Sequence, residues 1–171
     1  LGFRGEQGAL QTSFGRILGS DFDPAALVDG LGTRFEIMRG YFKPYSACRY
    51  AHGAVDAVLA LRSAEGFQLE DITAVRVETY DIATRLAEHA PQTPLAGRFS
   101  LPFVVAATLT TGGAGPDIFR PDVLGDPAVC SLAARVQVAE DPALTALTPA
   151  QRPARVTLEM VDGRVLSQTV M

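Results

Sequence analysis

Lysine is almost absent from this chain. Of its 15 lysine and arginine residues, only Lys43 is a lysine. Arginine stays charged and binds carboxylates through a flat fork, whereas lysine is the cation that proteins can adapt to proton transfer. Because Pro44 follows the single lysine, the chain has no glycine-rich phosphate loop ending in Lys-Ser or Lys-Thr.

Histidine and cysteine are scarce as well. The chain has two of each, His52, His89, Cys48 and Cys130, and no two of them stand at metal-ligand spacing with a third. This argues against a structural zinc site, and we expect no metal. Two distant cysteines do not form the disulfide framework of a secreted protein, so we expect a reducing, cytoplasmic location.

Basic clusters and long hydrophobic runs are also missing. The net charge is -4 and the sequence pI is about 5.1, which argues against binding nucleic acid or anionic membranes. The longest apolar run, residues 101–109, is interrupted by Pro102 and Thr108 and is too short to span a bilayer. The first five residues show no secretory leader pattern. With 47% hydrophobic residues among 171, we expect one globular domain over residues 1–171.

Hydrophobic periodicity and turn signals predict a mixed set of elements. Asp162-Gly163 lies between two alternating runs and predicts a two-residue hairpin turn. The hairpin and the order of elements favour an α+β fold, a two-layer sandwich with a mixed or antiparallel sheet and helices on one face. We expect helices at 6–15, 24–31, 46–64, 81–90, 100–111 and 126–134, and strands at 33–41, 72–80, 135–139, 154–161 and 164–170.

The residues best suited to chemistry are concentrated between Phe42 and His52. Proline after Lys43 favours extended backbone at the lysine. If a helix begins near Cys48, then Cys48, His52 and Asp56 lie one turn apart on one face. A helix N-terminus with Lys43 nearby attracts a carboxylate, and a titratable imidazole suits proton removal beside it.

Each of these residues also has an ordinary structural interpretation. Cys48 is a common type of small core residue, and His52 could be a packed histidine whose ring is satisfied by Asp56. Arg49 could pair with an acidic residue on the surface. Tyr45 and Tyr50 are as well explained by packing as by binding.

A second candidate stretch is Arg98-Phe99-Ser100-Leu101-Pro102-Phe103. Ser100 suits a helix N-cap and Pro102 suits the first turn, so the stretch predicts a helix start. A helix start beside Arg98 is also a suitable carboxylate site. Both interpretations remain open.

Together the two stretches resemble the signatures of the MmgE/PrpD family. The first runs Phe42-Lys43-Pro44-Tyr45-Ser46-Ala47-Cys48-Arg49-Tyr50-Ala51-His52 and continues as Gly53-Ala54-Val55-Asp56-Ala57; the second is Arg98 to Phe103. Their spacing and the Val-x-Val-x-Thr-Tyr strand between them also match. The resemblance covers nearly the whole chain.

The resemblance implies a place within a larger enzyme. The family includes 2-methylcitrate dehydratases, cis-aconitate decarboxylases and iminodisuccinate epimerases, which need no cofactor and tend to be dimers. Members combine a large helical domain with a smaller α+β domain, and this chain resembles the smaller, C-terminal one. The substrate cleft lies between the two domains, so the resemblance implies that this domain alone is inactive and that the large helical domain and a second subunit are its partners.

The implied reaction is removal of water from a small di- or tricarboxylate, such as 2-methylcitrate in propionate metabolism. Lys43 would neutralise a carboxylate or relay a proton, His52 or a histidine of the large domain would act as acid or base, and Cys48 would line the cleft. An epimerase or isomerase is an alternative, as is a non-catalytic carboxylate-binding domain. Decarboxylases of the family carry histidine at the position of Cys48, which disfavours that activity. The residues expected to hold carboxylates are Tyr45, Ser46, Arg49, Arg98 and Ser100.

Overall fold

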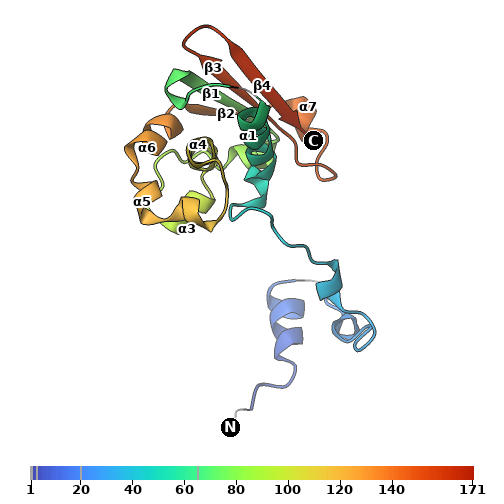
Figure 1. Cartoon of the computed structure of the whole chain (residues 1–171). Helices are drawn as coiled ribbons and strands as arrows, with labels where there is room; N and C mark the ends of the chain where they lie inside the picture. Colours follow the sequence, from blue (N-terminus) through green and yellow to red (C-terminus); the bar gives the residue numbers. More distant parts are fainter. Residues whose placement is uncertain (1, 3, 20, 65) are drawn as a thin grey trace. The chain divides into compact units, whose positions relative to one another are not determined.

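The structure is a computed structural model that describes residues 2, 4–19, 21–64 and 66–171. The chain forms two compact units, Leu1–Phe42 and Lys43–Met171 (Figure 1). Both candidate stretches, from Lys43 onward, belong to the second unit. Among the described residues, no helix is both long and apolar enough to cross a membrane.

The first unit consists of short helical segments: η1 (Gln11–Ile17), η2 (Pro24–Leu27) and η3 (Glu36–Arg39). The Asp23 side chain accepts a hydrogen bond from the amide of Ala25 and so caps η2, whose first residue is Pro24. The strand expected at 33–41 is wrong, because this stretch contains η3. A strand needs a second strand to hydrogen-bond its backbone amides and carbonyls, and the described part of this unit contains no strand.

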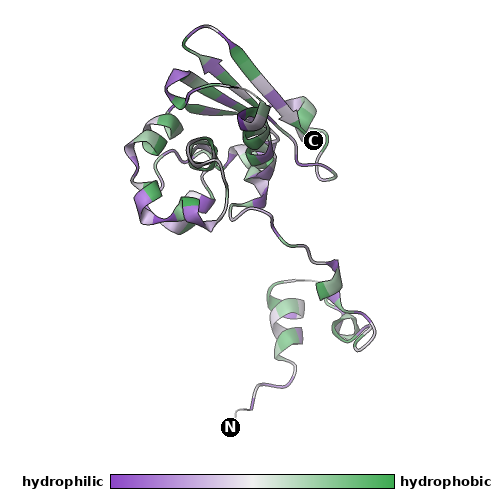
Figure 2. Ribbon diagram, viewed as in Figure 1, coloured by the Kyte–Doolittle hydropathy of each residue, from purple (hydrophilic) through white to green (hydrophobic). Residues whose placement is uncertain are grey.

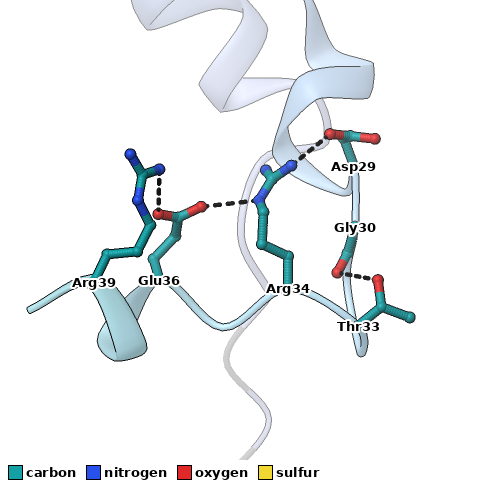
Figure 3. Close-up of polar contacts among 6 residues, drawn as sticks. All are labelled: Asp29, Gly30, Thr33, Arg34, Glu36 and Arg39. Carbon is teal, nitrogen blue, oxygen red and sulfur yellow. Dashed lines mark hydrogen bonds and ion pairs between the residues drawn. The ribbon is translucent and has the colours of Figure 1, made fainter.

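Local polar contacts organise the first unit (Figure 3). Arg34 bonds Asp29 and Glu36, each at 2.8 Å, and Arg39 bonds Glu36 at 3.1 Å. All of these side chains are exposed, so each pair contributes little, roughly 0–1 kcal/mol. None of the unit's described residues is buried, so this unit has no core of its own among them.

The second unit is built on a four-stranded sheet of β1 (Ile72–Thr79), β2 (Val136–Glu140), β3 (Ala154–Met160) and β4 (Val165–Val170). The strand order is β2-β1-β3-β4. β1 runs parallel to β2 and antiparallel to β3, and β3 runs antiparallel to β4. This mixed sheet confirms the α+β fold class.

Two helices, α1 (His52–Ala64) and α4 (Leu101–Thr111), pack on one face of the sheet, and α6 (Pro127–Ala133) packs against α4 (Figure 1). Buried apolar residues of these helices and of β1, β2 and β3 form one core cluster, and Figure 2 shows hydrophobic stretches along the ribbon of this unit. β3 alternates buried and half-buried residues. α4 is buried along almost its whole length. The remaining short helices are η4 (Arg49–Ala51), η5 (Leu69–Asp71), α2 (Asp81–Thr84), α3 (Pro94–Arg98), η6 (Pro116–Phe119), α5 (Pro121–Leu124) and α7 (Pro142–Thr145).

One predicted helix boundary differs for a tertiary reason. The helix expected at 81–90 ends at Thr84, because the carbonyls of Leu86 and Glu88 accept hydrogen bonds from Leu101 and Ser100 at the start of α4. The expected strands at 72–80, 135–139, 154–161 and 164–170 are present as β1 to β4, each within a residue or two at its ends.

The hairpin between β3 and β4 has a three-residue loop, not the predicted two-residue turn. The Gly163 amide donates to the Met160 carbonyl at 3.0 Å, and the Met160 amide donates to the Arg164 carbonyl at 2.9 Å. Gly163 has φ 83°, the left-handed conformation that follows a turn in this type of loop.

The start of α1 packs very closely on the segment that leads into β3. A Cβ built on Gly53 would lie 2.7 Å from the carbonyl oxygen of Arg152 and 3.3 Å from the amide nitrogen of Ala154. Both are backbone atoms and cannot rotate away. Only glycine fits here without moving one of the two segments.

We therefore expect Gly53→Ala to lower the free energy of unfolding by about 1–3 kcal/mol, the usual cost of overpacking. Urea or thermal unfolding measures it. Gly113→Ala is the matched control, because a Cβ at Gly113 meets no atom within 4 Å. Equal stability of the two variants would show that α1 does not need this close approach.

Candidate active site

The stretch from Lys43 to Cys48 is an irregular loop rather than the start of a helix. The Ser46 amide donates to the Ala114 carbonyl at 3.1 Å, and the Cys48 amide donates to the Arg98 carbonyl at 2.8 Å. Cys48 has a non-helical backbone, with φ -55° and ψ 138°, so the helix expected from residue 46 begins as η4 at Arg49 and as α1 at His52. The second bond joins the two candidate stretches directly.

The joined stretches border a cavity of about 360 Å³, within the size range of small-molecule sites, roughly 300–1,000 Å³. Five of the eight expected site residues line this cavity. The other three, His52, Arg49 and Ser100, do not. The lining residues are Lys43, Tyr45, Ser46, Ala47, Cys48, Leu95, Arg98 and Phe99.

Two cations and no carboxylate line this cavity. Lys43 is exposed. The guanidinium carbon of Arg98 lies 5.5 Å from the centre of the Phe119 ring, which is buried. Such a cation–π contact restrains the arginine side chain without neutralising it. The cavity is therefore suited to an anion, which would face two positive charges with no acidic competitor in its wall.

His52 lies beneath this loop rather than in the cavity wall. Its side chain is almost fully buried, at 1% exposure, and its Nε2 is 3.3 Å from the Ala47 carbonyl. Because a carbonyl can only accept, Nε2 is the donor and Nδ1 is unprotonated. The Tyr45 ring meets the His52 ring edge-on at 5.2 Å. His52 thus fixes the loop from the side of α1.

The expected alignment of Cys48, His52 and Asp56 on one helix face is wrong. Cys48 precedes the helix, with φ -55° and ψ 138°, so helical spacing does not apply to it. Asp56 accepts a hydrogen bond from the Tyr45 hydroxyl, whereas the His52 ring bonds the Ala47 carbonyl. Cys48 is half-buried with a free thiol, and its Sγ is not in a disulfide.

Burial lowers the pKa of His52 below its usual value near 6.5. The Ala47 carbonyl and Asp56 act in the opposite direction, while the positive charges of Arg49 and Lys43 lower the pKa further. His52 is therefore neutral at pH 7. Burial, and then the bond to Asp56, raises the pKa of Tyr45 to about 12, which keeps its hydroxyl a donor.

Ser100 and Arg49 lie outside the cavity wall for different reasons. Ser100 is 1% exposed and accepts a hydrogen bond from the Phe103 amide at 3.0 Å, so it caps α4. It also donates to the Glu88 carbonyl. Arg49 lies half-buried on η4. Within residues 2, 4–19, 21–64 and 66–171, no group of three or more His, Cys, Asp or Glu residues could hold a metal ion.

The cavity also contains Leu95 and Phe99, which sequence analysis did not assign to the site. Leu95 resembled an ordinary apolar residue in the sequence. Phe99 lies inside the second stretch, directly after Arg98, and this position in the sequence could have identified it as a cavity residue.

A known protein family matches the part of the chain that forms most of the cavity wall. The chain matches the MmgE/PrpD C-terminal domain over residues 45–171. The matched range includes all of the cavity wall except Lys43, which lies two positions before Tyr45. No curated protein matches the chain significantly.

His52 should make the stability of the fold depend on pH. Because its folded-state pKa is lowered, the unfolded chain binds the proton more readily, and stability falls as the pH drops below about 6.5. We expect the melting temperature of wild type to fall between pH 7 and pH 5 by more than that of His52→Gln, which does not titrate.

His89→Gln is the control, because His89 is the other histidine of the chain, and its exposed side chain contacts the Ala133 carbonyl at 3.0 Å rather than the loop of the candidate site. This variant should keep the pH dependence of wild type, as followed by thermal unfolding from pH 5 to pH 8. The same pH profile in wild type and His52→Gln would show that His52 is not held neutral by the fold.

Proposed function

Because the chain belongs to the MmgE/PrpD family, as its C-terminal domain, we propose that it is the small domain of a lyase that acts on a small di- or tricarboxylate. The most suitable reaction is dehydration of a 2-hydroxy-tricarboxylate such as 2-methylcitrate. One observation carries this proposal: the Cys48–Arg98 bond brings both signature stretches to one cavity that has two cations and no carboxylate in its wall.

Dehydration removes a proton from the carbon beside a carboxylate. The electron pair of the broken C–H bond forms a C=C bond, and the hydroxyl group on the neighbouring carbon leaves with a proton as water. Negative charge builds up on the carboxylate-bearing carbon and its oxygens during this step. Positive groups placed against those oxygens lower the barrier.

Lys43 and Arg98 have complementary roles in this proposal. Arg98, restrained on the Phe119 ring, holds a substrate carboxylate through its fork of donors. Lys43 lies exposed at the cavity and can both neutralise developing charge and carry a proton, which a guanidinium cannot do. Ser46 and Cys48 also line the cavity.

His52 acts as a positioning residue in this proposal. Its burial and its bond to the Ala47 carbonyl support a role in fixing the loop, and the second acid–base group then comes from the large helical domain. The family's epimerases would share the same proton abstraction and differ only in where the proton returns. This chain alone offers half of the cleft, so we propose that turnover requires the complete enzyme.

The proposal is tested by Lys43→Arg in the complete enzyme. If Lys43 carries a proton, this substitution should lower kcat for 2-methylcitrate dehydration by about 100-fold or more, the usual contribution of general acid–base catalysis. Lys43→Ala should lower kcat by at least the same factor. Steady-state kinetics across pH, with folding checked by thermal melts, measure both.

Arg85→Lys is the matched control, because Arg85 is exposed and its partner Asp81 lies outside the cavity wall. It should keep the kcat of wild type. A Lys43→Arg enzyme with near-wild-type kcat would reduce Lys43 to a carboxylate-binding cation. Wild-type kcat in Lys43→Ala would remove the residue from the active site.

A further inference from the structure

β4 is an edge strand of the sheet, and its sequence does not protect that edge (Figure 1). A free edge offers amides and carbonyls to any other strand, so natural proteins commonly interrupt it with charge, proline or a bulge. β4 reads Val-Leu-Ser-Gln-Thr-Val, without a charged residue or a proline. Its register with β3 runs without interruption from Val165 to Val170. The opposite edge strand, β2, is shorter and ends at Glu140.

Every second residue of β4 directs its backbone amide and carbonyl away from the sheet. Hydrogen-bonded and non-hydrogen-bonded residue pairs alternate along an antiparallel pair of strands. The Met160 amide bonds the Arg164 carbonyl, so the β4 residue that follows Arg164, and every second one after it, faces the free edge. The Gln168 side chain agrees with this alternation, because it reaches the Thr169 carbonyl at 3.1 Å. The residues facing the free edge are Val165, Ser167 and Thr169.

The rest of β4 is held firmly in place. Leu166 and Val170 pack against the core cluster, and α1 packs on this strand. The side chains of the edge-facing residues point the other way and are exposed, with Val165 at 63% exposure. No residue of β4 lines the cavity of the candidate site. The free edge is therefore a preformed surface separate from that cavity.

We propose that two copies of this chain associate through their β4 edges, as antiparallel neighbours related by a two-fold axis at Ser167. In this register Val165 lies opposite Thr169 of the second copy, and Ser167 lies opposite itself. These pairs are uncharged, and β-branched residues suit paired strands, so β4 is complementary to its own copy. The outward amides and carbonyls then find partners, and the two sheets become one. A two-fold contact closes on itself and stops at a dimer.

Disulfide trapping tests the contact and its register. Directly opposed, hydrogen-bonded residues have Cα atoms about 5.5 Å apart, which a disulfide can span. In a Cys48→Ala and Cys130→Ala background, Ser167→Cys should form a linked dimer under mild oxidation. Val165→Cys is the matched control, because its two copies would lie about 13 Å apart along the strands. Ser167→Cys should crosslink about tenfold faster or more, since pairing raises the local thiol concentration.

Sedimentation of the chain at increasing concentration measures the association itself. Ser167→Pro removes an outward amide and leaves the bonds to β3 intact, because an edge strand tolerates proline where its amide faces solvent. Val165→Lys adds the charge that natural edges use. Each should raise the dimer dissociation constant about tenfold or more, and either suffices if the other fails to fold. Gln137→Lys, exposed on β2, is the matched control and should keep the wild-type constant.

Three results would overturn the proposal. The first is a chain that stays monomeric at several hundred micromolar. The second is a dimer that both β4 variants leave unchanged, because association would then use another surface, such as the exposed apolar residues of the first unit. The third is equal crosslinking of Ser167→Cys and Val165→Cys, which would contradict the axis at Ser167. None of these measurements needs turnover, so they are independent of the proposed function.

Discussion

The site depends on one hydrogen bond between two distant backbone segments, from the Cys48 amide to the Arg98 carbonyl. A backbone amide withdrawn from water needs a partner, and this one finds it across the fold rather than along a helix. The bond from Ser46 to Ala114 acts in the same way. Together they anchor the Lys43–Cys48 loop, which ends in the non-helical backbone of Cys48, and α1 begins only at His52.

The opposite side of the loop is fixed by α1. His52 bonds the Ala47 carbonyl, and Tyr45 packs on the His52 ring while its hydroxyl donates to Asp56. Gly53 lets this end of α1 lie against the backbone of Arg152. The loop is therefore held from two directions, which presents Lys43 and Arg98 to one cavity without an acidic residue in its wall.

Local sequence signals predicted the parts of the fold that depend on local chemistry. Ser100 caps α4 as expected, because capping involves only neighbouring residues. The strand predicted at 33–41 is wrong, because alternating apolar and polar residues do not supply a second strand to pair with. The helix expected from residue 46 failed at its first turns because Cys48 has a non-helical backbone, with φ -55° and ψ 138°, and its amide bonds the distant Arg98 carbonyl.

In the candidate site, too, local sequence signals predicted some features, and tertiary contacts determined the others. Two short motifs were enough to predict that Lys43, Cys48 and Arg98 belong to one site, and the structure brings them to one cavity. Helical spacing grouped Cys48 with His52 and Asp56, which the delayed start of α1 undoes. Leu95 could not be identified from sequence, because an apolar helical residue suggests burial, and only the folded chain reveals its exposure.

The central claim is that both signature stretches contact a single carboxylate ligand. The most direct test is a titration of the ¹⁵N-labelled chain with tricarballylate, which carries three carboxylates. The amide signals of Ser46 and Cys48 should shift together with those of Arg98 and Phe99, along one saturation curve. Shifts confined to one stretch, or centred on the separate cavity that includes Thr111 and Val123, would contradict the account.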